Sequence, residues 1–194
     1  MPRPAQIDRD SVLAAALAVA DAGGVAGLSM RAVAERLGVT AMALYRHVGD
    51  KQQLLDGLVE RLLLELPLPD PALPWRQRLT AMGAAMRQTA QAHPQVFPLL
   101  LQRPAVTPGA RRVREAVYQA LRDAGAAEEL VPRIERVLST FVLGFAASEA
   151  AGRFTAGKQE LDLDLAWFGE WVLNSLASVD RAPGPGQAAE DMNE

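Results

Sequence analysis

The sequence predicts an all-α fold, and three observations support this prediction. Apolar residues recur at the i, i+3, i+4, i+7 spacing that places them on one face of a helix. Ser, Thr or Asp precedes several of these stretches and Gly follows them, as is typical of helix starts and ends. No stretch has the two-residue alternation, bounded by turn dipeptides, that is typical of β-strands.

The composition limits the classes of protein and site. The chain has 194 residues, 49% hydrophobic and 22% charged, so it is long enough to bury a core and too apolar to be largely disordered. It contains no cysteine, which excludes disulfides, thiolate metal sites and cysteine nucleophiles. Its polar first ten residues lack a signal-peptide pattern, and the uncharged run 137–148 is shorter than the roughly 20 residues of a membrane span. We expect a cytoplasmic protein with no membrane partner, no metal and no cofactor.

The first helix is predicted to begin after Asp8 and to end at Gly23-Gly24. Asp8 is a favourable N-cap, and Ile7 can pack on Val12 across it as a hydrophobic staple. Glycine accepts the left-handed backbone found at helix C-termini. The apolar stripe of this helix comprises Leu13, Ala16, Leu17 and Ala20.

Two short helices follow, with the proportions of a helix-turn-helix motif. The first begins at Ser29 and ends at Gly38, and the second begins at Thr40 and ends at Gly49. If Leu44 lies at the centre of the buried face of the second helix, a rotation of 100° per residue places four other residues on the outward face. The side chains of this face fit contact with a DNA major groove better than exposure to solvent alone. The outward residues are Met42, Ala43, Tyr45 and Arg46.

A fourth helix is predicted to start with a capping box at Asp50 and Gln53 and to run to Pro67. The proline-rich segment 67–74 then breaks the helical pattern, since proline lacks a backbone donor and disfavours helix before it. Beyond it, a larger body is expected with helices near 75–92, 95–102, 108–124, 129–152 and 162–178. The Pro- and Gly-rich residues 181–194 are expected to be a disordered tail.

The residues of the two short helices resemble a known family. Leu-Ser-Met-Arg-Ala-Val-Ala-Glu-Arg-Leu-Gly-Val-Thr at 28–40 and Leu-Tyr-x-His-Val-x-x-Lys at 44–51 are similar to the DNA-binding signature of tetracycline-repressor (TetR) family regulators. Trp75 and the stretch 141–145 resemble the C-terminal domain of the tetracycline repressor branch. The resemblance implies a homodimeric, all-helical repressor that a small molecule releases from a palindromic double-stranded DNA operator. It divides the chain into a DNA-binding domain at 1–51 and a ligand-binding and dimerisation domain at 52–180, connected by the helix 51–66.

The resemblance also implies a role for each matching position. Arg31 matches an arginine that can reach the O6 and N7 edge of guanine. Ser29 and Thr40 match capping positions that face phosphates. Ala41, Met42 and Ala43 match base-reading positions and carry no hydrogen-bonding side chain, so apolar contacts are expected. The remaining matches are phosphate contacts, or for Arg46 a base or phosphate contact: Tyr45, Arg46, His47 and Lys51. By spacing alone, His47 could equally form a hydrogen bond within the domain.

The predicted helices near 129–152 and 162–178 are apolar over most of their circumference. Core helices of a monomer would give the same pattern, but the family resemblance favours a four-helix interface between two copies. The residues expected at this interface are Val142, Phe145, Ala146, Phe168, Val172 and Leu176.

The body is also expected to enclose a pocket for a small effector, although any one of its lining residues could be ordinary packed core. The candidates are Met82, Met86, Phe97, Leu100, Leu101, Val113, Val117, Leu138 and Phe141. Methionine suits variable ligands because it is flexible and polarizable. This lining is apolar where the tetracycline repressor presents metal- and drug-binding polar groups. An uncharged or weakly polar effector, bound without metal, is therefore expected.

Two alternatives remain at this point. The chain could be a constitutive dimeric DNA-binding protein whose body binds no effector, in which case the body would contain no ligand-sized cavity. It could also be a helical enzyme. The sequence contains no phosphate-binding loop, nucleophile elbow or paired-histidine metal motif, so no catalytic residue is named and an enzyme is not expected.

Overall fold

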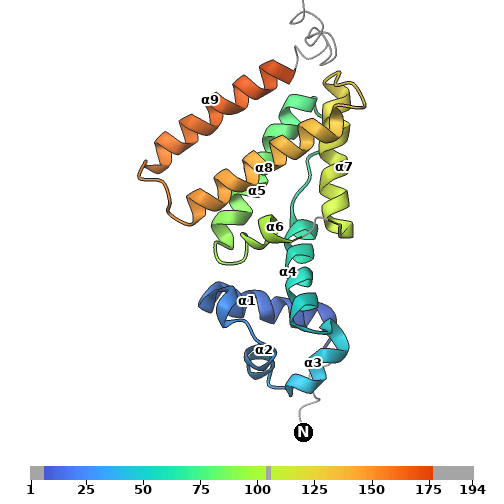
Figure 1. Cartoon of the computed structure of the whole chain (residues 1–194), viewed down its shortest axis with the longest axis vertical. Coiled ribbons are helices and arrows are strands. Elements are labelled where there is room, and N and C mark those ends of the chain that lie inside the picture. The colour runs from blue at the N-terminus through green and yellow to red at the C-terminus, as the bar shows by residue number, and fades with distance from the viewer. Residues whose placement is uncertain (1–6, 104–105, 177–194) are drawn as a thin grey trace, which may run out of the picture.

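The computed structural model describes residues 7–103 and 106–176. Within these ranges the chain forms nine α-helices and no β-strand, which confirms the predicted fold class (Figure 1). The predicted tail lies outside the described residues. The helices are α1 (Arg9–Gly27), α2 (Met30–Leu37), α3 (Ala41–Val48), α4 (Lys51–Glu65), α5 (Trp75–Ala92), α6 (Leu99–Gln102), α7 (Pro108–Asp123), α8 (Val131–Ala150) and α9 (Lys158–Leu176).

α1 begins as the sequence predicts but does not end there. Asp8 accepts a hydrogen bond from the Ser11 backbone N–H at 2.8 Å, and the Asp8 N–H donates to Ser11 Oγ at 3.0 Å. The expected end at Gly23-Gly24 is a kink, because Gly24 takes a left-handed φ of 73° and the chain then resumes helical geometry to Gly27. α1 is long and apolar enough by composition to cross a membrane, but Val12 and Ala16 are fully buried in the core. That burial identifies it as a core helix.

α2 and α3 follow the predicted boundaries. Ser29 Oγ accepts from the Ala32 N–H at 3.1 Å, and Gly38 ends α2 with a φ of 67°. Thr40 occupies the N-cap of α3, but its hydroxyl forms no capping hydrogen bond. Leu44 and Val48 bury one side of α3 against α1 and α2.

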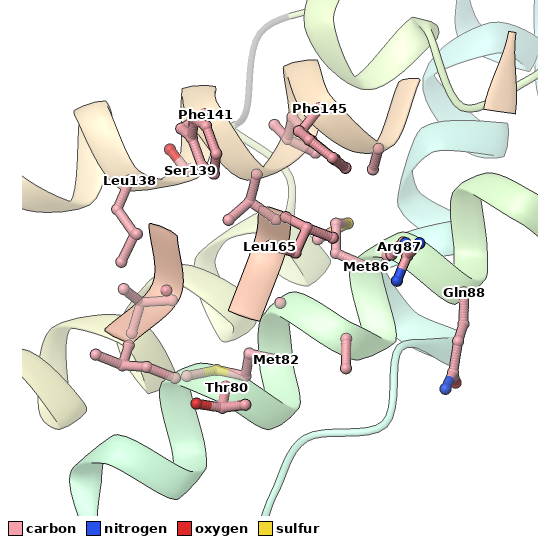
Figure 2. Close-up of a pocket in the computed structure, with 18 of the residues that line it drawn as sticks. Thr80, Met82, Met86, Arg87, Gln88, Leu138, Ser139, Phe141, Phe145 and Leu165 are labelled. Carbon is pink, nitrogen blue, oxygen red and sulfur yellow. The ribbon is translucent and has the colours of Figure 1, made fainter. Parts of the chain in front are cut away.

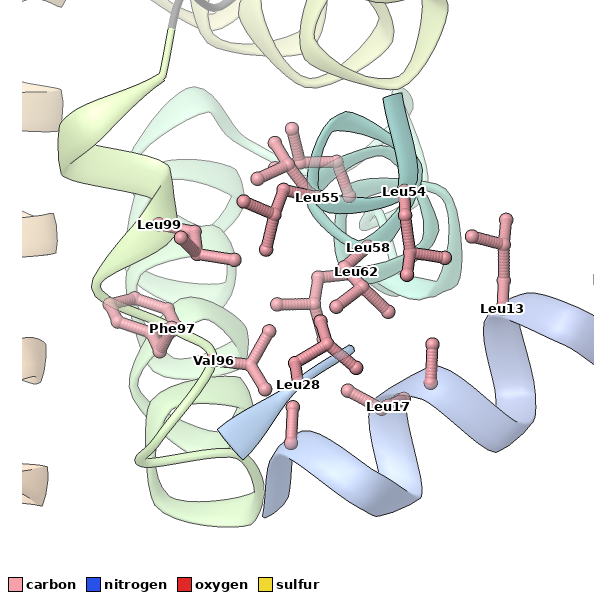
Figure 3. Packing of buried hydrophobic residues seen from close by; sticks show 14 of the residues in the cluster. Leu13, Leu17, Leu28, Leu54, Leu55, Leu58, Leu62, Val96, Phe97 and Leu99 are labelled. Atoms are coloured by element: carbon pink, nitrogen blue, oxygen red, sulfur yellow. The ribbon is translucent and has the colours of Figure 1, made fainter. Parts of the chain in front are cut away.

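α4 leads from the three N-terminal helices into the body (Figure 1). The predicted capping box is confirmed, since Asp50 Oδ1 accepts from the Gln53 N–H at 2.8 Å and the Asp50 N–H donates to Gln53 Oε1 at 3.0 Å. Leu54, Leu58 and Leu62 are buried between α1 and the segment that precedes α6 (Figure 3). One apolar core thus joins the N-terminal helices to the lower body.

Two body helices differ from their predicted bounds. The helix expected at 95–102 is limited to Leu99–Gln102, because residues 94–98 form turns in which the Val96 and Phe97 N–H groups donate to the His93 carbonyl. The helix expected at 162–178 begins at Lys158, where the Leu161 N–H donates to the Gly157 carbonyl at 3.1 Å. Burial of Leu161 stabilises this additional first turn.

Candidate nucleic-acid interface and ligand cavity

The outward face of α3 carries large exposed side chains on a helix whose opposite face is buried. Met42 is 76% exposed and Tyr45 is 49% exposed, while Leu44 is fully buried. The apolar contacts of Leu44 and Val48 fix the rotation of α3, so the outward side chains are held in a defined orientation. Such a face is typical of a helix that enters a major groove.

Polar and cationic groups surround this face. Arg46 and Lys51 are exposed, and His47 is half-buried. Thr40 is exposed with a hydroxyl that caps nothing within the described chain, which leaves it free to bind a phosphate. Arg31 Nε donates to Glu35 Oε1 at 2.8 Å, and this hydrogen bond raises the Arg31 pKa. Because the pair is exposed, Arg31 can exchange Glu35 for another acceptor at little cost.

A cavity of about 610 Å³ lies between α5, α7, α8 and α9 (Figure 2). This volume falls in the range of small-molecule sites. Phe141 and Phe168 contribute rings with centroids 4.0 Å apart and planes tilted by 33°, and the Phe145 ring centroid lies 6.0 Å from that of Phe141. The walls are therefore mainly aliphatic and aromatic.

Seven of the predicted pocket residues lie in this lining: Met82, Met86, Leu100, Val113, Val117, Leu138 and Phe141. Two predicted residues do not. Phe97 is fully buried in the core that the body shares with the N-terminal helices, and Leu101 points to solvent with 48% exposure. The short length of α6 explains both corrections, because only Leu100 on this turn faces the cavity.

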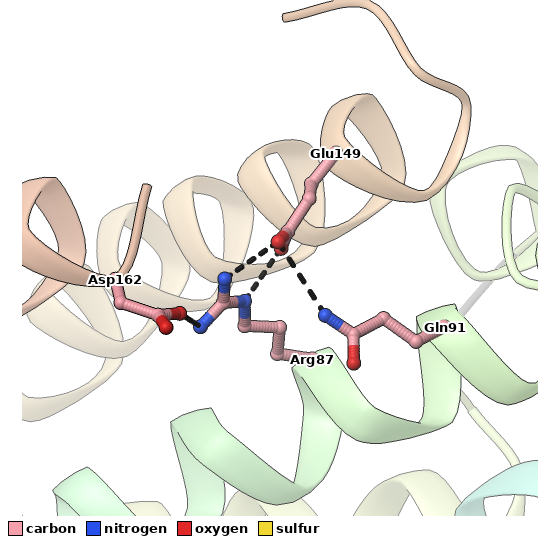
Figure 4. A network of polar contacts seen from close by, with 4 residues as sticks. All are labelled: Arg87, Gln91, Glu149 and Asp162. Carbon is pink, nitrogen blue, oxygen red and sulfur yellow. Dashed lines mark hydrogen bonds and ion pairs between the residues drawn. The ribbon is translucent and has the colours of Figure 1, made fainter. Parts of the chain in front are cut away.

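A charged network at one side of the cavity was not predicted (Figure 4). Arg87 on α5 donates from Nε and Nη2 to the two carboxylate oxygens of Glu149 on α8, both at 2.5 Å. Its Nη1 donates to Asp162 Oδ1 on α9 at 2.6 Å, and Gln91 donates to Glu149 at 3.4 Å. These hydrogen bonds, led by that of Glu149, raise the Arg87 pKa. One guanidinium thus joins three helices beside the cavity.

The predicted dimer residues face inward in the described chain. Five of them line the cavity, and Leu176 is buried against α5 and α7 residues. The exposed apolar side chains of these helices lie elsewhere: Val137 on α8 is 73% exposed, and Leu163, Trp167 and Trp171 on α9 are 66%, 71% and 58% exposed. An apolar helix surface does not reveal which side packs within its own chain, and the part of these residues in a dimer interface stays a prediction. The inward residues are Val142, Phe145, Ala146, Phe168, Val172 and Leu176.

α4 is held to the body by polar contacts along its length. The Glu60 carboxylate accepts from the Gly109 N–H at the start of α7, at 2.9 and 3.0 Å, where the helix dipole favours a negative charge. Arg112 donates to the Leu63, Leu64 and Leu66 carbonyls at the end of α4. Arg103 after α6 donates to Asp56 at 2.5 Å. A shift of α6 or α7 would therefore be transmitted to α4.

A second contact joins α1 to the body. His93 Nδ1 at the end of α5 lies 2.9 Å from Asp21 Oδ2. The segment after His93 places Val96 and Phe97, both fully buried, in the core beside Leu17 and Leu28 (Figure 3). The N-terminal helices are thus coupled to the body through α4 and through this segment.

The residues missed by sequence reasoning fall into two groups. Glu149 and Asp162 lie 62 and 75 positions after Arg87 in the sequence, so no local sequence pattern pairs them with it. Leu163, Trp167 and Trp171, in contrast, recur at four-residue spacing on one side of α9. That spacing was visible in the sequence and could have identified the exposed stripe.

Comparisons with known proteins agree with this arrangement. Residues 12–58 match the profile of "Bacterial regulatory proteins, tetR family", and residues 68–166 match that of "Tetracyclin repressor-like, C-terminal domain". The chain is 34% identical over 76% of its length to an HTH-type transcriptional regulator of Saccharopolyspora erythraea, of which it spans only 63%. It is 30% identical over 95% of its length to the class A tetracycline repressor of Escherichia coli, of which it spans 86%.

Solved structures share the fold over most of the chain. BioQ with its double-stranded DNA operator superposes with a TM-score of 0.75 at 27% identity, covering 89% of this chain and 99% of BioQ. The TetR family protein ActR of Streptomyces coelicolor with actinorhodin superposes with a TM-score of 0.78 at 24% identity, covering 90% and 97%. The helix-turn-helix geometry, the two matched profiles and the relative matched over 95% of the chain lead to one conclusion: the chain belongs to the TetR family of bacterial regulatory proteins.

Proposed function

We propose that the protein is a cytoplasmic, dimeric transcriptional repressor that binds a palindromic operator and is released from it by a small, largely apolar molecule. The exposed face of α3, with Met42, Tyr45 and Arg46 opposite a fully buried Leu44, carries this proposal. Two relatives are named as a transcriptional regulator and a transcriptional repressor, which supports a regulatory rather than an enzymatic role.

DNA contacts are proposed for ten residues. Arg31 reads a guanine edge, the α3 residues Ala41, Met42 and Ala43 contact thymine methyls, and the others bind phosphates or, for Arg46, a base. BioQ, 27% identical, has been solved with its operator, which supports the same use of this fold. The full set is Ser29, Arg31, Thr40, Ala41, Met42, Ala43, Tyr45, Arg46, His47 and Lys51.

A dimer is proposed through the exposed apolar stripes of α8 and α9, here called the α8/α9 surface. It comprises the exposed apolar residues Val137 on α8 and Leu163, Trp167 and Trp171 on α9, together with the exposed Thr140 and the half-buried Gly144 of α8. Beyond its chain neighbours and the backbone of its own helix, a Cβ at Gly144 would meet no atom of the described chain within 4 Å, so this glycine leaves room for a partner helix. Aromatic residues are favoured at the centres of such interfaces.

The cavity favours a ligand-gated regulator over the constitutive alternative, because a body that only dimerises needs no space of about 610 Å³. ActR, which shares this fold, has been solved in complex with actinorhodin, which supports this use. The lining is mainly aliphatic and aromatic, so we propose an effector that binds without magnesium.

Operator selection from genomic fragments, followed by sequencing, tests the proposal. The recovered site should be a palindrome with half-site centres roughly 34–36 Å apart, or slightly more. Tyr45→Ala should weaken binding to the recovered site, while Arg153→Ala, which removes an exposed charge beyond α8, should leave it unchanged. Recovery of random fragments, or equal losses in both variants, would contradict the proposal.

A further inference from the structure

The cavity has a charged side whose chemistry narrows the class of ligand. Its aromatic and aliphatic walls end at Arg87 and Gln88 on α5, which lie together at one side of the cavity (Figure 2). Lys158 and Asp162 of α9 line the same cavity. This inference rests on the proposed function and deepens it by specifying the ligand: it replaces the expected uncharged or weakly polar effector with a largely apolar molecule that carries one anionic group.

Arg87 has hydrogen-bonding capacity to spare. A guanidinium carries five N–H donors, and Glu149 and Asp162 accept three of them. The contacts differ in strength: Glu149 binds two nitrogens and is 9% exposed, whereas Asp162 accepts one hydrogen bond and is 48% exposed. Solvent screens the Asp162 contact more strongly, so a ligand could replace Asp162 far more easily than Glu149.

Lys158 adds a second positive charge at the same side. It precedes Asp162 by one helical turn, lies on the same side of α9 and is exposed. A cation at the start of a helix is unfavourably placed relative to the helix dipole. An anion held between Lys158 and Arg87 would offset that unfavourable placement.

A cationic ligand fits this arrangement poorly. It would have to approach Asp162 beside Lys158 and withdraw the carboxylate from Arg87. We propose that the cavity binds an amphipathic small molecule with a flat apolar body against the phenylalanine rings and one anionic group, a carboxylate or sulfonate, between Arg87 and Lys158. Asp162 occupies part of that anion site in the free protein.

A matched pair of fluorescent probes tests this preference. 1-Anilinonaphthalene-8-sulfonate carries one sulfonate on an aromatic body, and N-phenyl-1-naphthylamine has the same body without it. Titrations at low ionic strength should show that Asp162→Asn tightens sulfonate-probe binding and Lys158→Gln weakens it, each by about three- to tenfold. The affinity for the neutral probe should change by less than about twofold.

Asp164→Asn is the matched control, since Asp164 is an exposed carboxylate on α9 outside the cavity lining. It should leave both affinities unchanged, and thermal melts should show that all three variants fold. The inference is overturned if neither probe binds saturably, if the two probes respond alike, or if Asp164→Asn has the effect of Asp162→Asn.

Operator binding measured in the same samples separates this inference from the proposed function. If the variants shift sulfonate-probe binding as expected but neither probe weakens operator binding, the anion site stands and release by this class of ligand fails. If the neutral probe releases the operator as well as the charged one, and the variants alter nothing, ligand-gated release stands and the anion site fails.

Discussion

At the scale of single residues, Arg31 and Lys51 should respond differently to removal. Arg31→Ala should weaken operator binding by about ten- to hundredfold and relax the preference at one base pair, if Arg31 leaves Glu35 to read guanine. Lys51→Ala should weaken binding to all sequences alike and reduce the slope of log affinity against log salt by about one unit. Fluorescence anisotropy on operator and scrambled duplexes measures both effects. Equal, sequence-independent losses would restrict Arg31 to a phosphate contact.

Asp123 provides a pH-dependent contribution to stability. The buried Arg78 on α5 donates to the Asp123 carboxylate at the end of α7, which holds the pKa of Asp123 below its ordinary value. A lowered folded-state pKa contributes stability above the unfolded-state pKa of about 3.9, and this is lost as pH falls through the folded-state value. Asp123→Asn should therefore destabilise the protein at pH 7.

Denaturant unfolding at pH 7 and at pH 3 measures this effect. The difference between wild type and Asp123→Asn should shrink at pH 3, because this pH lies below the unfolded-state pKa and part of the contribution is then lost. Asp164→Asn on α9 serves as the control and should show little difference at either pH. A constant wild-type to Asp123→Asn difference would show that packing, and not charge, accounts for the loss.

At the scale of elements, the attachment of α4 to α7 is expected to control the coupling between cavity and operator. Arg112→Met removes hydrogen bonds to three carbonyls at the end of α4, which should cost about 1–3 kcal/mol of unfolding free energy and loosen α4 from α7. Arg111→Met is the matched control, because Arg111 is an exposed neighbour of Arg112 on α7 and forms none of these hydrogen bonds.

The measurement combines a ligand thermal shift with an operator titration. Arg112→Met should still bind an effector but should release the operator less completely than Arg111→Met, because the ligand-induced shift no longer reaches α4. Full release by both variants would show that coupling runs through the segment 93–98 instead.

Local chemistry allowed most elements to be predicted. Asp8, Ser29 and Asp50 form the expected caps because an N-cap bond depends on residues three positions apart, and the left-handed Gly38 ends α2 for an equally local reason. Long-range packing was inaccessible. Phe168 and Trp167 are adjacent on α9, and the rotation of this helix determines that Phe168 faces the cavity while Trp167 faces solvent. Apolar composition alone does not predict that rotation.

At the scale of the whole molecule, the α8/α9 surface should determine oligomeric state. Trp167→Arg places a charge on the α9 part of this surface, so light scattering should show a shift from dimer to monomer, with operator affinity falling as the paired recognition helices separate. Leu73→Arg is the control, since Leu73 is an exposed apolar residue in the segment between α4 and α5. An unchanged dimer in Trp167→Arg would exclude this surface.

The segment that carries Val96 and Phe97 limits how freely the body of this protein can be exchanged for that of another regulator. The proline-rich connection 67–74 looks like a natural junction for a chimera, yet a body joined there brings its own residues 96 and 97 into a core shared with Leu17, Leu28 and Leu62. A graft with smaller side chains at 96 and 97 would leave a void, and one with larger side chains would strain the core. A chimera of this protein therefore requires that the DNA-reading helices, the connecting helix and the 93–98 segment be exchanged together, because their side chains pack in one core.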